Sequence, residues 1–127
     1  LASNDADRSE WFRACSVNGT QLYPYPGPYD DSLCNDDNSG VDPADDHPEC
    51  GVGALINLSG NVHEWENTCT TKNTPNALFD NCVRRGGAYF SASEDLACAL
   101  STAKGNDQTT GTLPGTPSDN TGFRCCH

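Results

Sequence analysis

The chain is poor in basic residues. It has seven Lys and Arg against 18 Asp and Glu, a formal net charge of −11 over 127 residues. The basic residues are scattered along the sequence, so they form no cationic cluster for nucleic acid or for an anionic membrane. We therefore expect neither as a partner, and cations are the more natural ligands of so acidic a chain.

Long apolar runs are also missing. No stretch approaches the roughly 18 apolar residues that a membrane-spanning helix needs, and no basic-then-apolar leader opens the chain. Apolar residues make up only 35% of the sequence, and turn-forming residues crowd the remainder. We expect one domain over residues 1–127, of α+β class, irregular and loop-rich, with a modest core.

Paired C-x-x-C knuckles with nearby histidines do not occur, which argues against a zinc site. Cysteine itself is abundant, and an even number of cysteines without metal spacing indicates disulfides in an oxidising compartment. We expect a secreted or periplasmic, extracellular protein. The eight cysteines are Cys15, Cys34, Cys50, Cys69, Cys82, Cys98, Cys125 and Cys126.

Sequence order suggests some of the pairings but does not determine them. Cys34 with Cys50 would close the acidic loop, and Cys69 with Cys82 would close a Thr- and Asn-rich loop. The remaining four are expected to pair as Cys15 and Cys98 with Cys125 and Cys126, in an order that stays open. A bridge from one of these cysteines to another chain is the alternative.

One helix is predicted near the start of the chain. Asn4 or Asp5 can cap it, and Trp11, Phe12 and Cys15 share one face at helical spacing, which favours core packing. Residues 51–58 form a short strand or a turn, and residues 82–90 and 121–126 are predicted strands. Residues 106–120 are expected to form a surface loop.

Three motifs follow one another in a specific order. Residues 57–65 read Asn-Leu-Ser-Gly-Asn-Val-His-Glu-Trp, residues 85–90 read Arg-Gly-Gly-Ala-Tyr-Phe, and residues 122–124 read Gly-Phe-Arg. They resemble the GNVWEW, RGGSW and GFR signatures of the formylglycine-generating enzyme (sulfatase-modifying factor) family. The resemblance implies a variant of the C-type lectin fold.

Residues 1–14 are similar to the helix entry that lies in the middle of the family domain. The resemblance therefore implies that the N-terminal half of the family domain is missing here. Two explanations stay open, a proteolytic origin and a naturally short homologue. In the first, the chain's own N-terminal half is a possible partner as a separate chain.

The resemblance also implies a calcium site. The equivalent turn in the family binds calcium through two side chains and two backbone carbonyls, which correspond here to Asn57, Gly60, Val62 and Glu64. Calcium takes six to eight oxygen ligands of these kinds. The alternative is that Asn57 and Glu64 bond the backbone amides of the turn. His63 stands where the family has Trp, and we assign it no role.

A second calcium is expected in the acidic loop. Family members often bind one there through an Asn and an Asp, and Asn35 and Asp36 are the nearest counterparts. A cluster of carboxylates is otherwise a solvated surface, which is the alternative reading of this loop.

The enzymatic activity of the family needs two cysteines that hold copper(I) through soft thiolates. The corresponding positions are Ser91 and Leu96, so we expect no copper. Cys98 lies close by, but one thiolate does not replace two, and a disulfide is its expected fate. The iron-dependent relatives need a His triad that this chain lacks. Arg85 and Arg124 are expected to be structural.

Two functional classes remain. The first is a non-catalytic secreted module, stiffened by calcium and disulfides, whose loops bind a protein or a glycan. Its expected ligand surface comprises Tyr23, Tyr25 and Tyr29 with residues 109–120, because aromatic and adaptable polar groups suit recognition. The second is an enzyme of the same family that acts together with the missing N-terminal half, on an unknown reaction.

Overall fold

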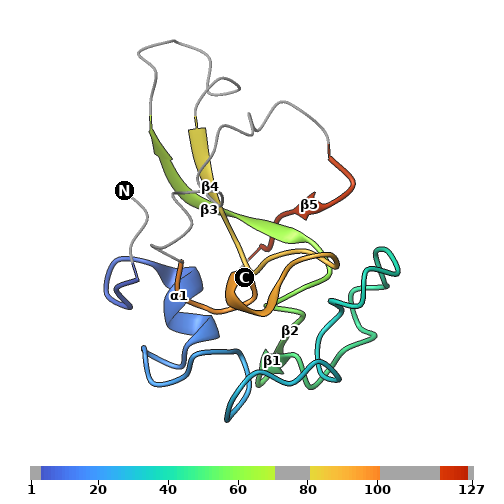
Figure 1. Ribbon diagram of the computed structural model, residues 1–127. Helices are drawn as coiled ribbons and strands as arrows, with labels where there is room; N and C mark the ends of the chain where they lie inside the picture. Colours follow the sequence, from blue (N-terminus) through green and yellow to red (C-terminus); the bar gives the residue numbers. More distant parts are fainter. Residues whose placement is uncertain (1–3, 71–80, 101–117, 126–127) are drawn as a thin grey trace.

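The computed structural model describes residues 4–70, 81–100 and 118–125, and the account below concerns these residues. Regular elements are short and joined by long irregular segments (Figure 1). The order is α1 (Glu10–Cys15), β1 (Gly51–Val52), β2 (Leu55–Ile56), β3 (His63–Thr70), β4 (Asn81–Arg85), the 3-10 helix η2 (Ser93–Asp95) and β5 (Thr121–Gly122). A short helix and few short strands in a loop-rich body confirm the predicted fold class.

Helix α1 starts later than its predicted caps. Ser9 is the N-cap, and its side chain accepts a hydrogen bond from the amide of Phe12. Asp5 caps the preceding turn instead, where its carboxylate accepts from the amide of Asp7 at 2.9 Å. The capping prediction was therefore wrong, whereas Trp11, Phe12 and Cys15 lie on the buried face, as predicted.

The main sheet has three strands in the order β4-β3-β5. Strand β3 pairs antiparallel with β4 and parallel with β5, with His63 opposite Thr121. The sequence did not predict β3. Strand β4 ends at Arg85 rather than at residue 90, because Gly86 and Gly87 adopt φ values of +83° and +69°. Strand β5 is shorter than predicted, and β1 and β2 form a small hairpin.

Two apolar clusters form the core. One contains Tyr23, Tyr25, Cys34, Cys50, Leu96 and Ala97, and the other contains Trp11, Phe12, Cys15, Leu58 and Cys98. Each cluster contains one disulfide. The core is therefore a set of apolar side chains packed around covalent bridges, which suits a chain with little regular structure.

Three disulfides form among the described residues. Cys34–Cys50 and Cys69–Cys82 confirm the two predicted loop closures. The third prediction was wrong, because Cys15 bonds to Cys98 across 83 residues of sequence. Packing of α1 against the segment after η2 brings these two buried cysteines together. Cys125 is an exposed free thiol, and Cys126 lies outside the described residues.

No helix in the described ranges is long and apolar enough to cross a membrane.

Candidate functional site

The candidate site lies around the turn at residues 57–62, which leads into β3. Three of its residues, Asn57, Gly60 and Asn61, have φ values of +53°, +71° and +61°. A side chain at Gly60 would collide with the carbonyl of Asn35. The glycine thus lets two loops far apart in sequence touch through their backbones, and the amide of Asn61 donates to that same carbonyl at 2.8 Å.

Two amide oxygens in these loops lack partners. Asn57 donates through Nδ2 to the carbonyl of Ala44 at 2.8 Å, and Asn35 donates through Nδ2 to Gly40 and to Asn61. The Oδ1 atoms of Asn57 and Asn35 are buried and have no hydrogen-bond partner among the described residues. A buried acceptor without a donor is costly, so both oxygens are suited to bind a ligand.

Glu64, the carboxylate of the turn motif, faces the helix. Its Oε2 accepts from Trp11 Nε1 at 2.8 Å and from Arg124 Nε at 3.1 Å, while its Oε1 accepts from Arg124 Nη2 at 2.5 Å. The same Nη2 atom donates to the carbonyls of Ile56 and Asn57. Glu64 therefore bonds side chains, not the amides of its own turn, and Arg124 ties β5 to the turn.

A second ion pair, which is buried, lies two residues further along β3. Arg85 is fully buried, and its Nε donates to Glu66 Oε2 at 2.8 Å. Glu66 also accepts from the hydroxyl of Ser9, and the guanidinium lies 5.7 Å from the ring centroid of Trp11. The structural role expected for Arg85 and Arg124 is thus visible in both pairs.

Sequence reasoning missed Ser9 and Glu66 in this network. Glu64 and Glu66 are two apart, and alternate residues of a strand lie on one face. That spacing was the available signal for two carboxylates directed at the same side of β3.

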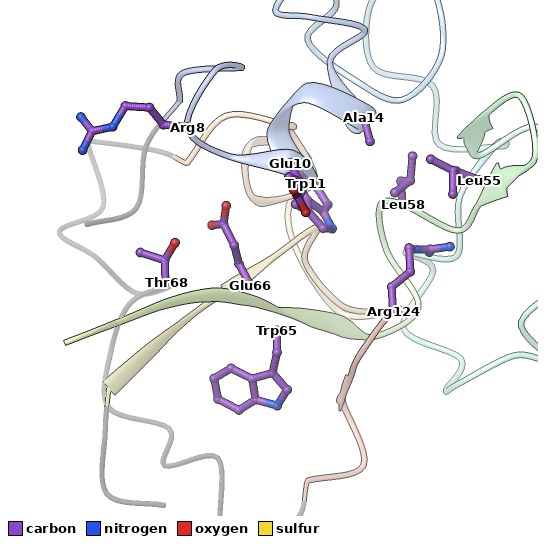
Figure 2. A pocket seen from close by; sticks show the side chains of 10 residues that line it. All are labelled: Arg8, Glu10, Trp11, Ala14, Leu55, Leu58, Trp65, Glu66, Thr68 and Arg124. Carbon is purple, nitrogen blue, oxygen red and sulfur yellow. The ribbon is translucent and has the colours of Figure 1, made fainter. Parts of the chain in front are cut away.

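A pocket of about 430 Å³ opens between α1 and β3 (Figure 2). Trp11, Ala14, Leu55 and Leu58 supply apolar walls, and Glu66, Thr68 and Arg124 supply polar ones. Ligand pockets in proteins commonly occupy some 300 to 1,000 Å³ and combine apolar walls with a few polar groups. This pocket matches both properties.

Ser91 and Leu96, which the family resemblance aligns with the copper cysteines, have structural roles. Ser91 Oγ accepts a hydrogen bond from the amide of Ala88 at 2.9 Å and so closes the turn after β4. Leu96 is 1% exposed and packs in the first apolar cluster. Cys98 is bonded to Cys15, as its predicted disulfide fate required.

The expected ligand surface is wrong for two of its three tyrosines. Tyr23 and Tyr25 are 6% and 5% exposed, and they stack on each other in the core with centroids 5.5 Å apart. Only Tyr29 is exposed, at 39%. Residues 109–117 of the predicted surface lie outside the described residues.

The acidic loop is organised by local hydrogen bonds. Tyr29 donates its hydroxyl to Asp36 Oδ2 at 2.5 Å, and this bond, with partial burial, raises the pKa of Tyr29. Hydrogen bonds from Ser32 and Ser39 lower the pKa values of Asp30 and Asp37. No cluster of three or more acidic, His or Cys side chains with metal-binding geometry occurs in residues 4–70, 81–100 and 118–125.

The model of the sulfatase-modifying factor enzyme 1-like domain matches residues 4–127. The chain belongs to this family. No curated protein and no solved structure shows a significant match. In this sulfatase-modifying factor-like domain, hydrogen bonds link the turn motif to the Arg-Gly-Gly segment, through Gly60 and Gly86, and to the Gly-Phe-Arg segment, through Glu64 and Arg124.

His63 replaces the motif tryptophan and gives this domain a pH-dependent element. Burial, assisted by the positive charge of Arg84, lowers the pKa of His63 to about 4. Its Nδ1 atom is buried without a partner among the described residues. The side chain packs edge-on against Phe90 with ring centroids 6.4 Å apart.

The free energy of unfolding should therefore fall as the pH drops. The unfolded chain binds a proton at the ordinary His value of 6.5, whereas folded His63 stays neutral down to about 4. Stability is fully present above pH 6.5 and is lost progressively toward pH 4, by about 3 kcal/mol at most. Urea denaturation at several pH values measures this loss. His63→Phe should flatten the profile in this window, and an unchanged slope would contradict the assignment.

Proposed function

We propose that this chain is a non-catalytic, secreted binding module on a sulfatase-modifying factor-like scaffold, held rigid by disulfides and by calcium. The observation that carries this proposal is which residues stand at the two positions that the resemblance assigns to copper, and what their side chains do. Ser91 closes a turn, and Leu96 fills the core. Neither side chain offers a thiolate, and copper(I) needs soft sulfur ligands.

Three disulfides support a secreted location, because such bridges persist in oxidising compartments. The pocket between α1 and β3 supports a binding role. Its apolar walls around Trp11 and its polar groups at Thr68 and Arg124 provide a surface for a protein or glycan ligand.

An activity assay tests the absence of catalysis. The oxidised chain is incubated with copper(I), oxygen and a cysteine-containing peptide, and the peptide mass is followed. We expect no loss of the peptide thiol to an aldehyde beyond the rate without protein. Oxygen-dependent conversion of that cysteine would overturn the proposal.

Calcium binding is proposed at the turn of residues 57–62. The unpartnered Oδ1 of Asn57 fits a hard cation, and the Gly60 and Val62 carbonyls and Glu64 Oε1 are its further ligands. Among the described residues, Oε1 accepts a hydrogen bond from Arg124 Nη2, which leaves the oxygen a second acceptor site. The nearby guanidinium opposes a second positive charge, so we expect modest affinity.

The second calcium is proposed at Asn35 and Asp36. Asn35 is 2% exposed, and its Oδ1 lacks a hydrogen-bond donor among the described residues. This oxygen is therefore suited to coordinate a cation. Asp36 is half-buried beside it and supplies negative charge. When bound, calcium would supply order by cross-linking the loops.

Calcium at millimolar concentration should raise the melting temperature, and a chelator should reverse the rise. At 100 times the Kd, a ligand that binds only the folded state stabilises it by about 2.7 kcal/mol. Asn57→Gly keeps the positive φ but removes the amide oxygen, so its calcium response should shrink.

Asn38→Gly is the matched control, because Asn38 is exposed and also has a positive φ of +66°. Its response to calcium should equal that of the unmodified chain. Equal responses of Asn57→Gly and the unmodified chain would remove Asn57 from the ligand set. No response in any of the three proteins would remove calcium from the proposal.

A further inference from the structure

The three disulfides differ in how far a reductant can reach them. Cys15 and Cys98 are 0% and 1% exposed, and Cys34 and Cys50 are 6% and 0% exposed. In the third bridge Cys82 is buried, at 8%, but Cys69 is exposed. Thiol-disulfide exchange requires a thiolate to approach one sulfur directly, so access controls the rate.

The Cys69–Cys82 bridge also lies beyond an irregularity in the pairing of β3 with β4. Strands β3 and β4 pair regularly at Glu64 with Arg85 and at Trp65 with Arg84. A register shift follows between Trp65 and Cys69, after which Cys69 pairs with Cys82. We call residues 69–70 and 81–82 the distal ribbon. It projects away from α1 and the β1-β2 hairpin (Figure 1).

The inner and distal parts of β3 are held by different forces. Inner β3 is anchored by the half-buried pair of Glu64 with Arg124 and the buried pair of Glu66 with Arg85. Beyond the register shift, the described pairing consists of two residue pairs, one of them the disulfide itself. An interrupted ladder opens locally without disturbing the strand behind it.

We propose that the Cys69–Cys82 disulfide is a redox-exchangeable clasp, which a dithiol reductant opens while the two core disulfides stay closed. One thiolate of the reductant attacks Cys69 Sγ and expels the Cys82 thiolate, which takes up a proton. The second thiol of the reductant then attacks the mixed disulfide and releases Cys69. The protein bridge gains two electrons and two protons, and the reductant leaves as its own disulfide. Reduction thereby frees the distal ribbon and leaves the core intact.

Differential alkylation of the native oxidised chain tests the proposal. Free thiols, Cys125 among them, are first blocked with N-ethylmaleimide. The chain is then exposed to limiting dithiothreitol, quenched at intervals with an isotopically labelled alkylating reagent, and mapped by peptide mass spectrometry. We expect the label at Cys69 and Cys82 to appear at least about tenfold faster than at the four core cysteines. Equal labelling rates at all six cysteines, or faster labelling of a core disulfide, would overturn the proposal.

Hydrogen exchange on the selectively reduced chain provides a second readout. Exchange should accelerate at least about tenfold at residues 69–70 and 81–82 and stay unchanged at residues 63–66. Acceleration that extends through residues 63–66 would show that the clasp supports the whole sheet, and the proposed local device would fail. The Cys69→Ser/Cys82→Ser double variant should reproduce the exchange pattern of the reduced chain without any reductant.

Discussion

Replacing both cysteines of the 83-residue bridge, as Cys15→Ala/Cys98→Ala, should lower the free energy of unfolding by about 4.5 kcal/mol. A bridge stabilises mainly by restricting the unfolded chain, and the restriction grows with the loop that it closes. This bridge is also the only covalent tie in the described structure between α1 and the segment after β4. Equilibrium denaturation in guanidinium chloride, without reductant, measures the change.

The Cys34→Ala/Cys50→Ala double variant is the matched control. Its cysteines are also buried, but the bridge spans 16 residues, so the expected loss is about 3 kcal/mol. Both variants lose similar side-chain packing, and the difference between them reports the loop length. A loss for Cys34→Ala/Cys50→Ala that equals or exceeds the other would contradict the loop-closure explanation.

Arg85→Met should destabilise the protein by about 3 to 5 kcal/mol, because it leaves a buried carboxylate without its partner. The Arg85 side chain is 0% exposed and that of Glu66 is 8% exposed. Arg85 also donates to Asn4 Oδ1 and to the carbonyl of Cys98. It therefore joins β4 to the N-terminal segment and to the Cys98 region, and its loss should loosen all three.

Two further variants identify the cause. Arg85→Met/Glu66→Leu removes both charges and should recover much of the loss, since a buried pair and an apolar replacement of similar volume are often close in energy. Arg13→Ala removes an exposed pair with Asp7 at 4.0 Å, and it should cost less than about 1 kcal/mol. If Arg85→Met costs no more than Arg13→Ala, the buried network contributes little to stability.

The strand that carries the motif was missed for a physical reason. A strand is recognised when polar residues alternate with apolar ones and the polar set faces water. In β3 the carboxylates of Glu64 and Glu66 are directed at Trp11, Arg124 and Arg85 instead. The alternation is present, but the carboxylates face the pocket and the core, and the arginines that neutralise them come from β4 and the end of the chain.

The helix start and the buried tyrosines have a similar explanation. Several residues near the start of the chain are able to cap a helix, and Ser9 does so where its hydroxyl also reaches Glu66. Tyr23 and Tyr25 lie in a segment rich in proline and aromatics, which sequence reasoning placed on the surface. They are buried because Cys34–Cys50 and Leu96 pack against them.

Several properties of this protein could be predicted from the amino-acid sequence alone. Composition indicated the loop-rich α+β class, the three motifs indicated the family, and proximity along the chain indicated two of the bridges. These signals are local, or they depend on short segments that retain a characteristic spacing. Ser91 and Leu96 stand where the family resemblance implies copper-binding cysteines, and this led to the prediction that no copper is bound.

The remaining properties depend on contacts between residues far apart in sequence. Three features arise only when α1, the acidic loop and the sheet pack together. They are the Cys15–Cys98 bridge, the burial of Arg85, and the side-chain oxygens of Asn35 and Asn57 that have no partner among the described residues. No local sequence pattern predicts these features, because each depends on which distant groups pack against the residue and exclude water from it. Packing, rather than residue type, therefore sets the difference between an exposed Cys69 and a buried Cys15.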